Sequence, residues 1–361
     1  MWRCSLRMRL IPIVVSIPFI LAYSQDSGQV QELQELDIRY AAELNHVPVG
    51  CRTIAMGNTG VTLPYNDMNI YWNPAAISFS ENYEISIEGA KLYGGLSSLG
   101  VLSFNAPVQN GLSTGILYKV FFPDLINEWD SLPGTLFDRQ YNYSIDGYPA
   151  KGVFHNNQHS INASLAKRFS IPIPRPSSFS LPIPVDIAVG LNIKSLIMTM
   201  TPGTTVRMGY NINLDVGMLF RIGVDYNLDE ETIRREVLMA ASFKDVLPTK
   251  MTWLHSYEDY EEPVDIAQSY GMAYIDRSGF LFGDWTVSLA LYRQYDISFH
   301  AGLEGDFFDI VAFRAGVSNK IVTLGAGVHY KNYSVDYTFT FDEIDYSLLR
   351  MSAGVKFNRK K

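Results

Sequence analysis

The sequence predicts an all-β protein whose strands close into a transmembrane antiparallel β-barrel of about fourteen strands. From Tyr83 onward, apolar and polar residues alternate with a period of two. Several alternating runs exceed the ~5–6 residues usual in soluble proteins and match the ~9–11 residues with which a tilted strand crosses a bilayer. The N-terminus, basic and then apolar, is typical of an exported chain.

Residues 1–24 have the layout of a cleavable signal peptide. Arg3, Arg7 and Arg9 form a basic region, and an apolar run follows from Leu10 to Tyr23. This run is shorter than the ~20 residues of a membrane-spanning helix. We therefore predict cleavage before Gln25 and export to the outer membrane. A buried N-terminal strand is the alternative, but it leaves the three arginines unexplained.

Composition excludes several classes of protein. The formal net charge is −8, and it becomes −11 without the leader, which carries three arginines and no acidic residue. Such a chain is a poor partner for nucleic acid. Cys51 is the only cysteine after the leader, so neither an intrachain disulfide nor a cysteine metal site is expected.

No apolar run after position 25 approaches the length of a membrane-spanning helix, although the chain contains 22 Tyr and 20 Phe and its mean hydropathy is +0.01. A closed barrel is the strand architecture that satisfies every backbone group in lipid. A soluble sandwich or propeller is the alternative, because its strands also alternate.

Alternation is clearest in Val185–Ile197 and Asn211–Ile222, where one face is aliphatic and the other carries Asn192, Lys194 and Asp215. We expect strands near 83–91, 97–105, 113–122, 158–169, 185–197, 211–222, 235–243, 269–276, 284–293, 296–304, 310–318, 321–329, 333–341 and 348–357. In this count two long structureless connections, 123–157 and 246–268, follow the third and seventh strands. Both would then emerge on one side, as the long loops of outer-membrane barrels do.

A motif precedes the strands. Residues 52–79 read RTIAMGNTGVTLPYNDMNIYWNPAAISF. This stretch resembles the N-terminal signature of the PorV/PorQ family of outer-membrane proteins, which is related to the fourteen-stranded FadL-type barrels. The matching positions are Met56, Gly57, Gly60, Val61, Asp67, Trp72, Asn73, Pro74 and Ala75. FRAGV at 313–317, LGAGVHY at 324–330 and DVLPT at 245–249 also resemble the family.

The chemistry of the box fits a plug. Gly57 and Gly60 permit close backbone approach, and Asn73-Pro74 has the residues of a helix cap and first turn. We therefore divide the chain into a signal peptide (1–24), an N-terminal extension with a plug-like segment (25–80) and a barrel (81–361). We expect the segment Cys51–Phe79 to lie at or inside the barrel and to close its periplasmic half. A strand-turn motif that merely closes the barrel is an equal alternative.

Catalytic and metal motifs are weak. The six histidines form no HExxH motif and no close pair at metal spacing. A hairpin turn at 331–332 would set His329 opposite Ser334, with Asp336 diagonal to them, but such polar pairs are common on a lumen face and no nucleophile elbow surrounds Ser334. We predict no enzyme, no metal and no cofactor.

Three roles stay open. The resemblance to PorV implies a binding and shuttle component of type IX protein secretion, with secreted cargo and secretion-system subunits as partners. The resemblance to FadL implies a channel for hydrophobic small molecules such as long-chain fatty acids. The third role is a structural scaffold. All three imply contact with outer-membrane lipid.

Overall fold

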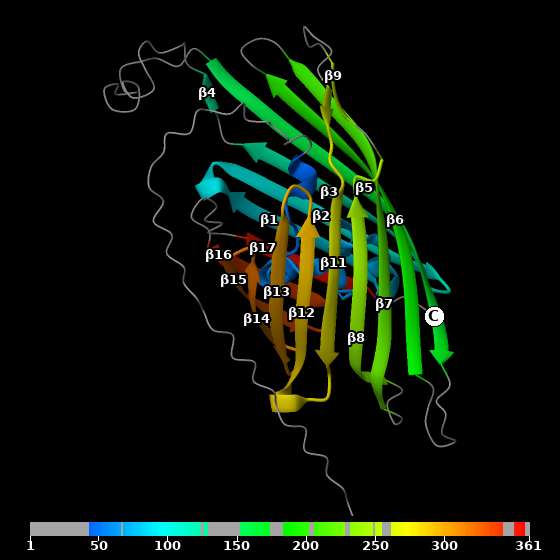
Figure 1. Cartoon of the computed structure of the whole chain (residues 1–361). Coiled ribbons are helices and arrows are strands. Elements are labelled where there is room, and N and C mark those ends of the chain that lie inside the picture. Colours follow the sequence, from blue (N-terminus) through cyan, green and yellow to red (C-terminus); the bar gives the residue numbers. More distant parts are fainter. Residues whose placement is uncertain are drawn as a thin grey trace, which may run out of the picture. The chain divides into compact units, whose positions relative to one another are not determined.

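The alternating segments form the predicted barrel in the computed structural model (Figure 1). The structure describes residues 43–65, 68–123, 126–128, 152–173, 183–201, 206–227, 232–247, 250–254, 261–341 and 350–357. The chain divides into two units, Met1–Ile38 and Arg39–Lys361, and all of the described residues belong to the second. The predicted signal peptide therefore lies outside the described residues.

Fourteen long strands make the wall, each antiparallel to the next. They are β1 (Tyr83–Leu92), β2 (Ser97–Gln109), β3 (Leu112–Pro123), β5 (Gly152–Ile173), β6 (Ile183–Thr201), β7 (Arg207–Asn227), β8 (Thr232–Lys244), β11 (Ala267–Asp276), β12 (Gly283–Arg293), β13 (Ile297–Phe307), β14 (Val311–Ser318), β15 (Ile321–Tyr330), β16 (Tyr333–Phe341) and β17 (Arg350–Phe357). The last strand pairs with the first, from Tyr83↔Phe357 to Ala90↔Arg350, and closes the ring. The predicted fold class and strand number are confirmed.

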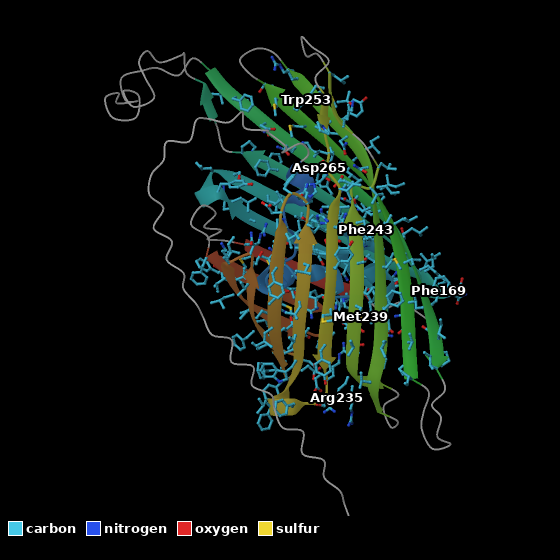
Figure 2. The ribbon with its side chains drawn as sticks, viewed as in Figure 1. Phe169, Arg235, Met239, Phe243, Trp253 and Asp265 are labelled. Atoms are coloured by element: carbon cyan, nitrogen blue, oxygen red, sulfur yellow. The ribbon has the colours of Figure 1, made fainter. Side chains whose placement is uncertain are left out.

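The polarity of the wall is that of a membrane barrel. Along β6, Leu191 and Ile193 point outward and are 49% and 60% exposed, whereas Asn192 and Lys194 between them are buried in the lumen. Large apolar side chains are exposed in this way on every long strand, and Figure 2 shows Phe169 and Met239 among them. A soluble protein rarely leaves an apolar surface of this size in water, so the outer face is the lipid face.

Strand direction defines two ends of the barrel. One, which we call the turn end, holds the start of β1, the end of β17 and the tight turns at 110–111 and 331–332. The other, the loop end, holds the ends of β3 and β8, from which both long connections leave. The predicted parity of the two connections therefore agrees with the strand order.

Those connections are not wholly structureless, which corrects the prediction. β4 (Ile126–Glu128) pairs with β5, while β9 (Lys250–Leu254) pairs with β7 and with β10 (Glu261–Pro263). β5 and β7 are also longer than expected, with 22 and 21 residues. Pro172 and Pro184, which lie between the strands expected near 158–169 and 185–197, face each other at the ends of β5 and β6. These extensions escape the two-residue pattern because proline and polar residues interrupt it.

Short helical turns lie inside the ring, where Figure 1 shows them in blue behind the front strands. They are η1 (Glu43–His46), α1 (Cys51–Ala55), η2 (Gly60–Thr62), α2 (Asn69–Trp72) and η3 (Pro74–Phe79). Two further turns, η4 (Tyr93–Gly95) and η6 (Phe280–Phe282), connect wall strands. Among the described residues, no helix is long and apolar enough to cross a bilayer. We call the described residues between Leu44 and Phe79 the plug.

Candidate functional site

The Asn73-Pro74 box caps η3 and ties it to the wall. Asn73 Oδ1 accepts a hydrogen bond from the Ala75 amide at 3.0 Å, and Pro74 takes the first helical position, as predicted. The Asn73 Nδ2 group donates to the carbonyl oxygens of Val61 and Met218, both at 3.0 Å. Asn73 therefore joins two plug turns to strand β7. Asn73, Val61 and Ala75 are buried, which makes the loss of the hydrogen bonds between them costly.

The Met56-Gly57 pair contacts the opposite part of the wall. Gly57 has φ 66°, a left-handed value that favours glycine. Its amide donates to Thr323 Oγ1 at 3.2 Å, and its carbonyl oxygen lies 2.9 Å from His300 Nδ1. Met56 is fully buried beside Gly302. This pair is therefore a second anchor of the plug, on β13 to β15.

Two pairs of wall glycines make room for these anchors. Gly190 and Gly217 face each other across β6 and β7, and a Cβ on either would overlap the Asn73–Ala75 backbone or side chain. Gly302 and Gly316 face each other across β13 and β14, and a Cβ on either would overlap Met56 or Gly57. The wall glycines are thus two notches for the two plug motifs. The Asn73-Pro74 box fills the lumen positions beside Gly190 and Gly217.

Gly60 and Trp72 hold the plug together internally. A Cβ at Gly60 would overlap the Trp72 indole, and Trp72 Nε1 donates to the Val49 carbonyl at 2.8 Å. Tyr71 packs edge-on against Trp72 with ring centroids 4.9 Å apart. Both rings belong to a buried apolar cluster that also includes side chains of β1, β2, β3, β5 and β6. Asp67, the remaining predicted signature residue, lies outside the described residues.

A chain of ion pairs that was not predicted from the sequence fastens the plug to the wall. Arg52 of α1 makes a bidentate pair with Glu304 of β13, at 2.8 Å and 2.6 Å. Arg314 on β14 reaches the same carboxylate at 2.5 Å and bonds Asp336 of β16 at 2.5 Å. A single carboxylate therefore bridges a plug guanidinium and a wall guanidinium.

A second charged cluster lies nearer the loop end. Lys194 pairs with Asp215 at 2.8 Å and with Asp245, of the DVLPT stretch, at 2.7 Å. His46 of the plug lies 3.5 Å from Asp245. Burial, helped by nearby lysines, lowers the pKa of His46 well below its usual value, so the ring is neutral at neutral pH. The plug therefore contacts two charged clusters of the wall, one at Arg52 and one at His46.

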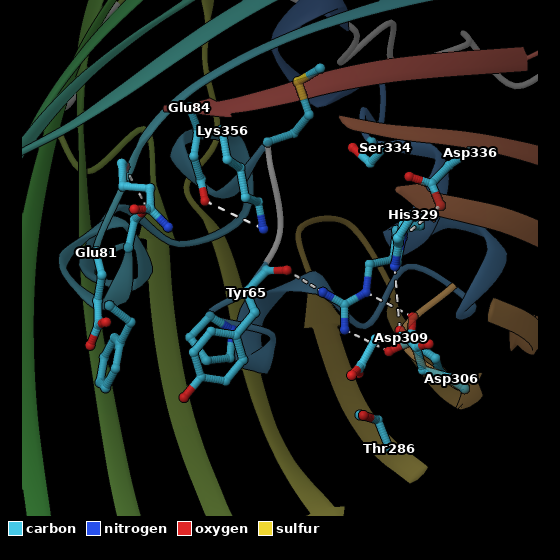
Figure 3. Close-up of a pocket in the computed structure, with 18 of the residues that line it drawn as sticks. Tyr65, Glu81, Glu84, Thr286, Asp306, Asp309, His329, Ser334, Asp336 and Lys356 are labelled. Atoms are coloured by element: carbon cyan, nitrogen blue, oxygen red, sulfur yellow. Dashed lines mark hydrogen bonds and ion pairs between the residues drawn. The ribbon is translucent and has the colours of Figure 1, made fainter. Parts of the chain in front are cut away.

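A cavity of about 600 Å³ separates the plug from the turn end (Figure 3). Arg52, Tyr65 and Met68 of the plug line it together with charged wall residues such as Glu84 and Lys356. The plug motifs sit midway along the strands, on the loop-end side of this cavity. That the segment closes the periplasmic half of the barrel stays a prediction.

The suspected His329–Ser334–Asp336 trio has the predicted register, because His329 faces Ser334 across β15 and β16. The two ring nitrogens of His329, however, lie 3.4 Å from Asp306 and 3.9 Å from Asp336 (Figure 3). A base placed between two carboxylates is oriented for ion pairing. This geometry does not assemble a serine nucleophile with its base.

Comparison with known proteins yields loose likeness only. No protein-family model and no curated protein matches the sequence. Among solved structures, the chain is similar to the toluene transporter TodX of Pseudomonas putida (12% identity, TM-score 0.42, 85% of this chain and 96% of that chain). It is also similar to a FadL homologue of Pseudomonas aeruginosa (10%, 0.44, 86% and 99%) and to the toluene transporter TbuX of Ralstonia pickettii (11%, 0.43, 85% and 97%). The fold assignment rests on the strand pairing of this chain itself.

Proposed function

We propose that this chain is a non-enzymatic outer-membrane barrel of the PorV/PorQ type that binds proteins during secretion and is closed by its own N-terminal segment. The main support for this proposal is that the plug occupies the lumen. Two glycine notches, the Arg52–Glu304 pair and two apolar clusters hold the plug between the barrel ends. A barrel closed by so many buried contacts is better suited to binding a partner at its surface than to steady conduction.

The lipid-facing belt supports the membrane location, and the predicted leader supports export to the outer membrane. The ion-paired surroundings of His329 support a role other than catalysis.

Deletion of the gene tests the secretion role. We expect secreted proteins to accumulate in the periplasm of the deletion strain, and the full-length gene to restore their release. Normal secretion in the deletion strain would contradict the proposal.

A channel for small hydrophobic molecules is the second candidate, and the cavity of about 600 Å³ favours it because this volume is typical of small-molecule pockets. Its charged lining suits a polar or amphiphilic solute better than a hydrocarbon. Growth of the deletion strain on long-chain fatty acids as sole carbon source separates the two roles: slowed growth with intact secretion indicates the channel.

A further inference from the structure

The cavity at the turn end has one basic wall, built by Arg168 of β5, Arg221 of β7 and Arg277 after β11. Two of these cations are neutralised by buried carboxylates. Arg221 pairs with Asp186 at 2.5 Å, and Arg277 pairs with Glu236 at 2.7 Å. They are therefore fixed in place and carry little uncompensated charge.

Arg168 differs from its two neighbours. Within the described ranges, no carboxylate oxygen lies within 4.0 Å of its side-chain nitrogens. Its guanidinium lies over the ring of Phe79, 5.1 Å from the centroid, and the Arg221 guanidinium lies 5.0 Å from the same centroid. Stacking on an aromatic ring orients a guanidinium while its N–H donors stay available for a ligand.

Phe79 is the last residue of η3 and is itself buried. Ile275 and Tyr65 also line the cavity and add apolar surface beside the arginines. An anionic group on Arg168 would therefore have room for an attached apolar group within the same cavity.

The rest of the lining limits the charge of such a ligand. Asp284 and Asp306 face each other across β12 and β13, and Asp309 follows in the next turn. These carboxylates repel anions, and they repel a ligand with two negative charges more strongly than one with a single charge.

We propose that the turn-end cavity binds a small monoanionic organic acid, with its carboxylate on the Arg168 guanidinium and its apolar part against Phe79 and Ile275. The planar carboxylate of the ligand and the planar guanidinium of Arg168 can form two parallel hydrogen bonds. The site lies on the opposite side of the plug from the loop end, and it does not depend on the secretion role proposed above.

Isothermal titration of the purified mature protein in detergent, at low ionic strength and neutral pH, tests the site with sodium benzoate. We expect saturable binding of one benzoate, weaker binding of acetate and no saturable binding of sulfate, which is a dianion at this pH. Arg168→Gln should weaken benzoate binding about tenfold or more, because a charge-assisted hydrogen bond is lost.

Lys167→Gln is the matched control, since Lys167 is the next residue on β5 and its ammonium bonds the Asn110 carbonyl at 2.5 Å outside the cavity. Its affinity should equal that of the wild type. The proposal is overturned if the wild type shows no saturable binding, if Arg168→Gln binds as well as the wild type, or if both variants lose affinity equally.

Asp284→Asn supplies a second test should Arg168→Gln fail to fold. Loss of a like charge from the cavity should tighten benzoate binding several-fold. Unchanged or weaker binding by this variant would overturn the proposal in its turn.

Discussion

Glu304→Gln should release the plug while leaving the barrel intact. The Glu304 carboxylate bridges Arg52 of the plug and Arg314 of the wall in a buried site. Removing one partner of a buried ion pair costs about 3–5 kcal/mol, because the remaining charge is left uncompensated. Since 1.4 kcal/mol is a factor of ten, the population of molecules with a displaced plug should rise about 10²-fold at the lower figure and over 10³-fold at the upper.

Cys51 provides the assay. It is the only cysteine after the leader, it is fully buried beside Arg52, and burial raises the pKa of its thiol. Alkylation by a maleimide in the folded protein therefore reports displacement of the plug. If closing is fast, the labelling rate follows the population of the open form.

Glu84→Gln is the matched control, because Glu84 meets Lys356 at 3.6 Å at the half-exposed rim of the same cavity. Exposed pairs contribute about 0–1 kcal/mol, so its labelling rate should change by no more than about fivefold. Retained mobility of the unheated protein in gel electrophoresis shows that each barrel is folded. Equal labelling of Glu304→Gln and Glu84→Gln in folded barrels would refute the claim that Glu304 holds the plug in place.

Three further changes test other parts of the structure. Val189→Arg places a cation on the lipid face at a cost of ~2–4 kcal/mol and should lower the yield of folded barrel. Gly190→Ala, one residue along, fills a plug notch, so it should leave the yield unchanged and raise Cys51 labelling. Equal effects of the two on yield would mean that the faces are misassigned. Asn73→Leu removes three hydrogen bonds, each about 1 kcal/mol, and should increase Cys51 labelling more than it lowers abundance. A change in abundance alone would make the box a folding element. The mature protein should stay with the outer membrane after a carbonate wash and begin near Gln25, and recovery in the soluble fraction would contradict the barrel.

The wall was predictable because its pattern is local. Alternation in segments such as Val185–Ile197 predicts the strand and also which residues face lipid and which face the lumen. A shift of one residue would move every side chain to the other face, so the pattern allows one assignment. The cap at Asn73-Pro74 is local too, so the short helix that follows could be predicted from two residues.

The site was less predictable because its contacts are distant in sequence. Arg52 and Glu304 are 252 positions apart, and nothing near either residue indicates the other. A charged residue at a lumen position implies a buried partner, but it does not say which. Glycines such as Gly190 and Gly217 occupy lumen positions of adjacent strands. Their recurrence could have indicated the notches, but the strand register is needed to show that they face each other.

Single-channel recording of the purified mature protein in a planar bilayer tests the central claim, that the N-terminal segment closes the barrel. The structure predicts no steady conductance for the wild type, because the plug fills the lumen midway along the strands, and it predicts openings for Glu304→Gln at a matched protein concentration. Steady conductance of the wild type, unchanged by Glu304→Gln, would contradict it.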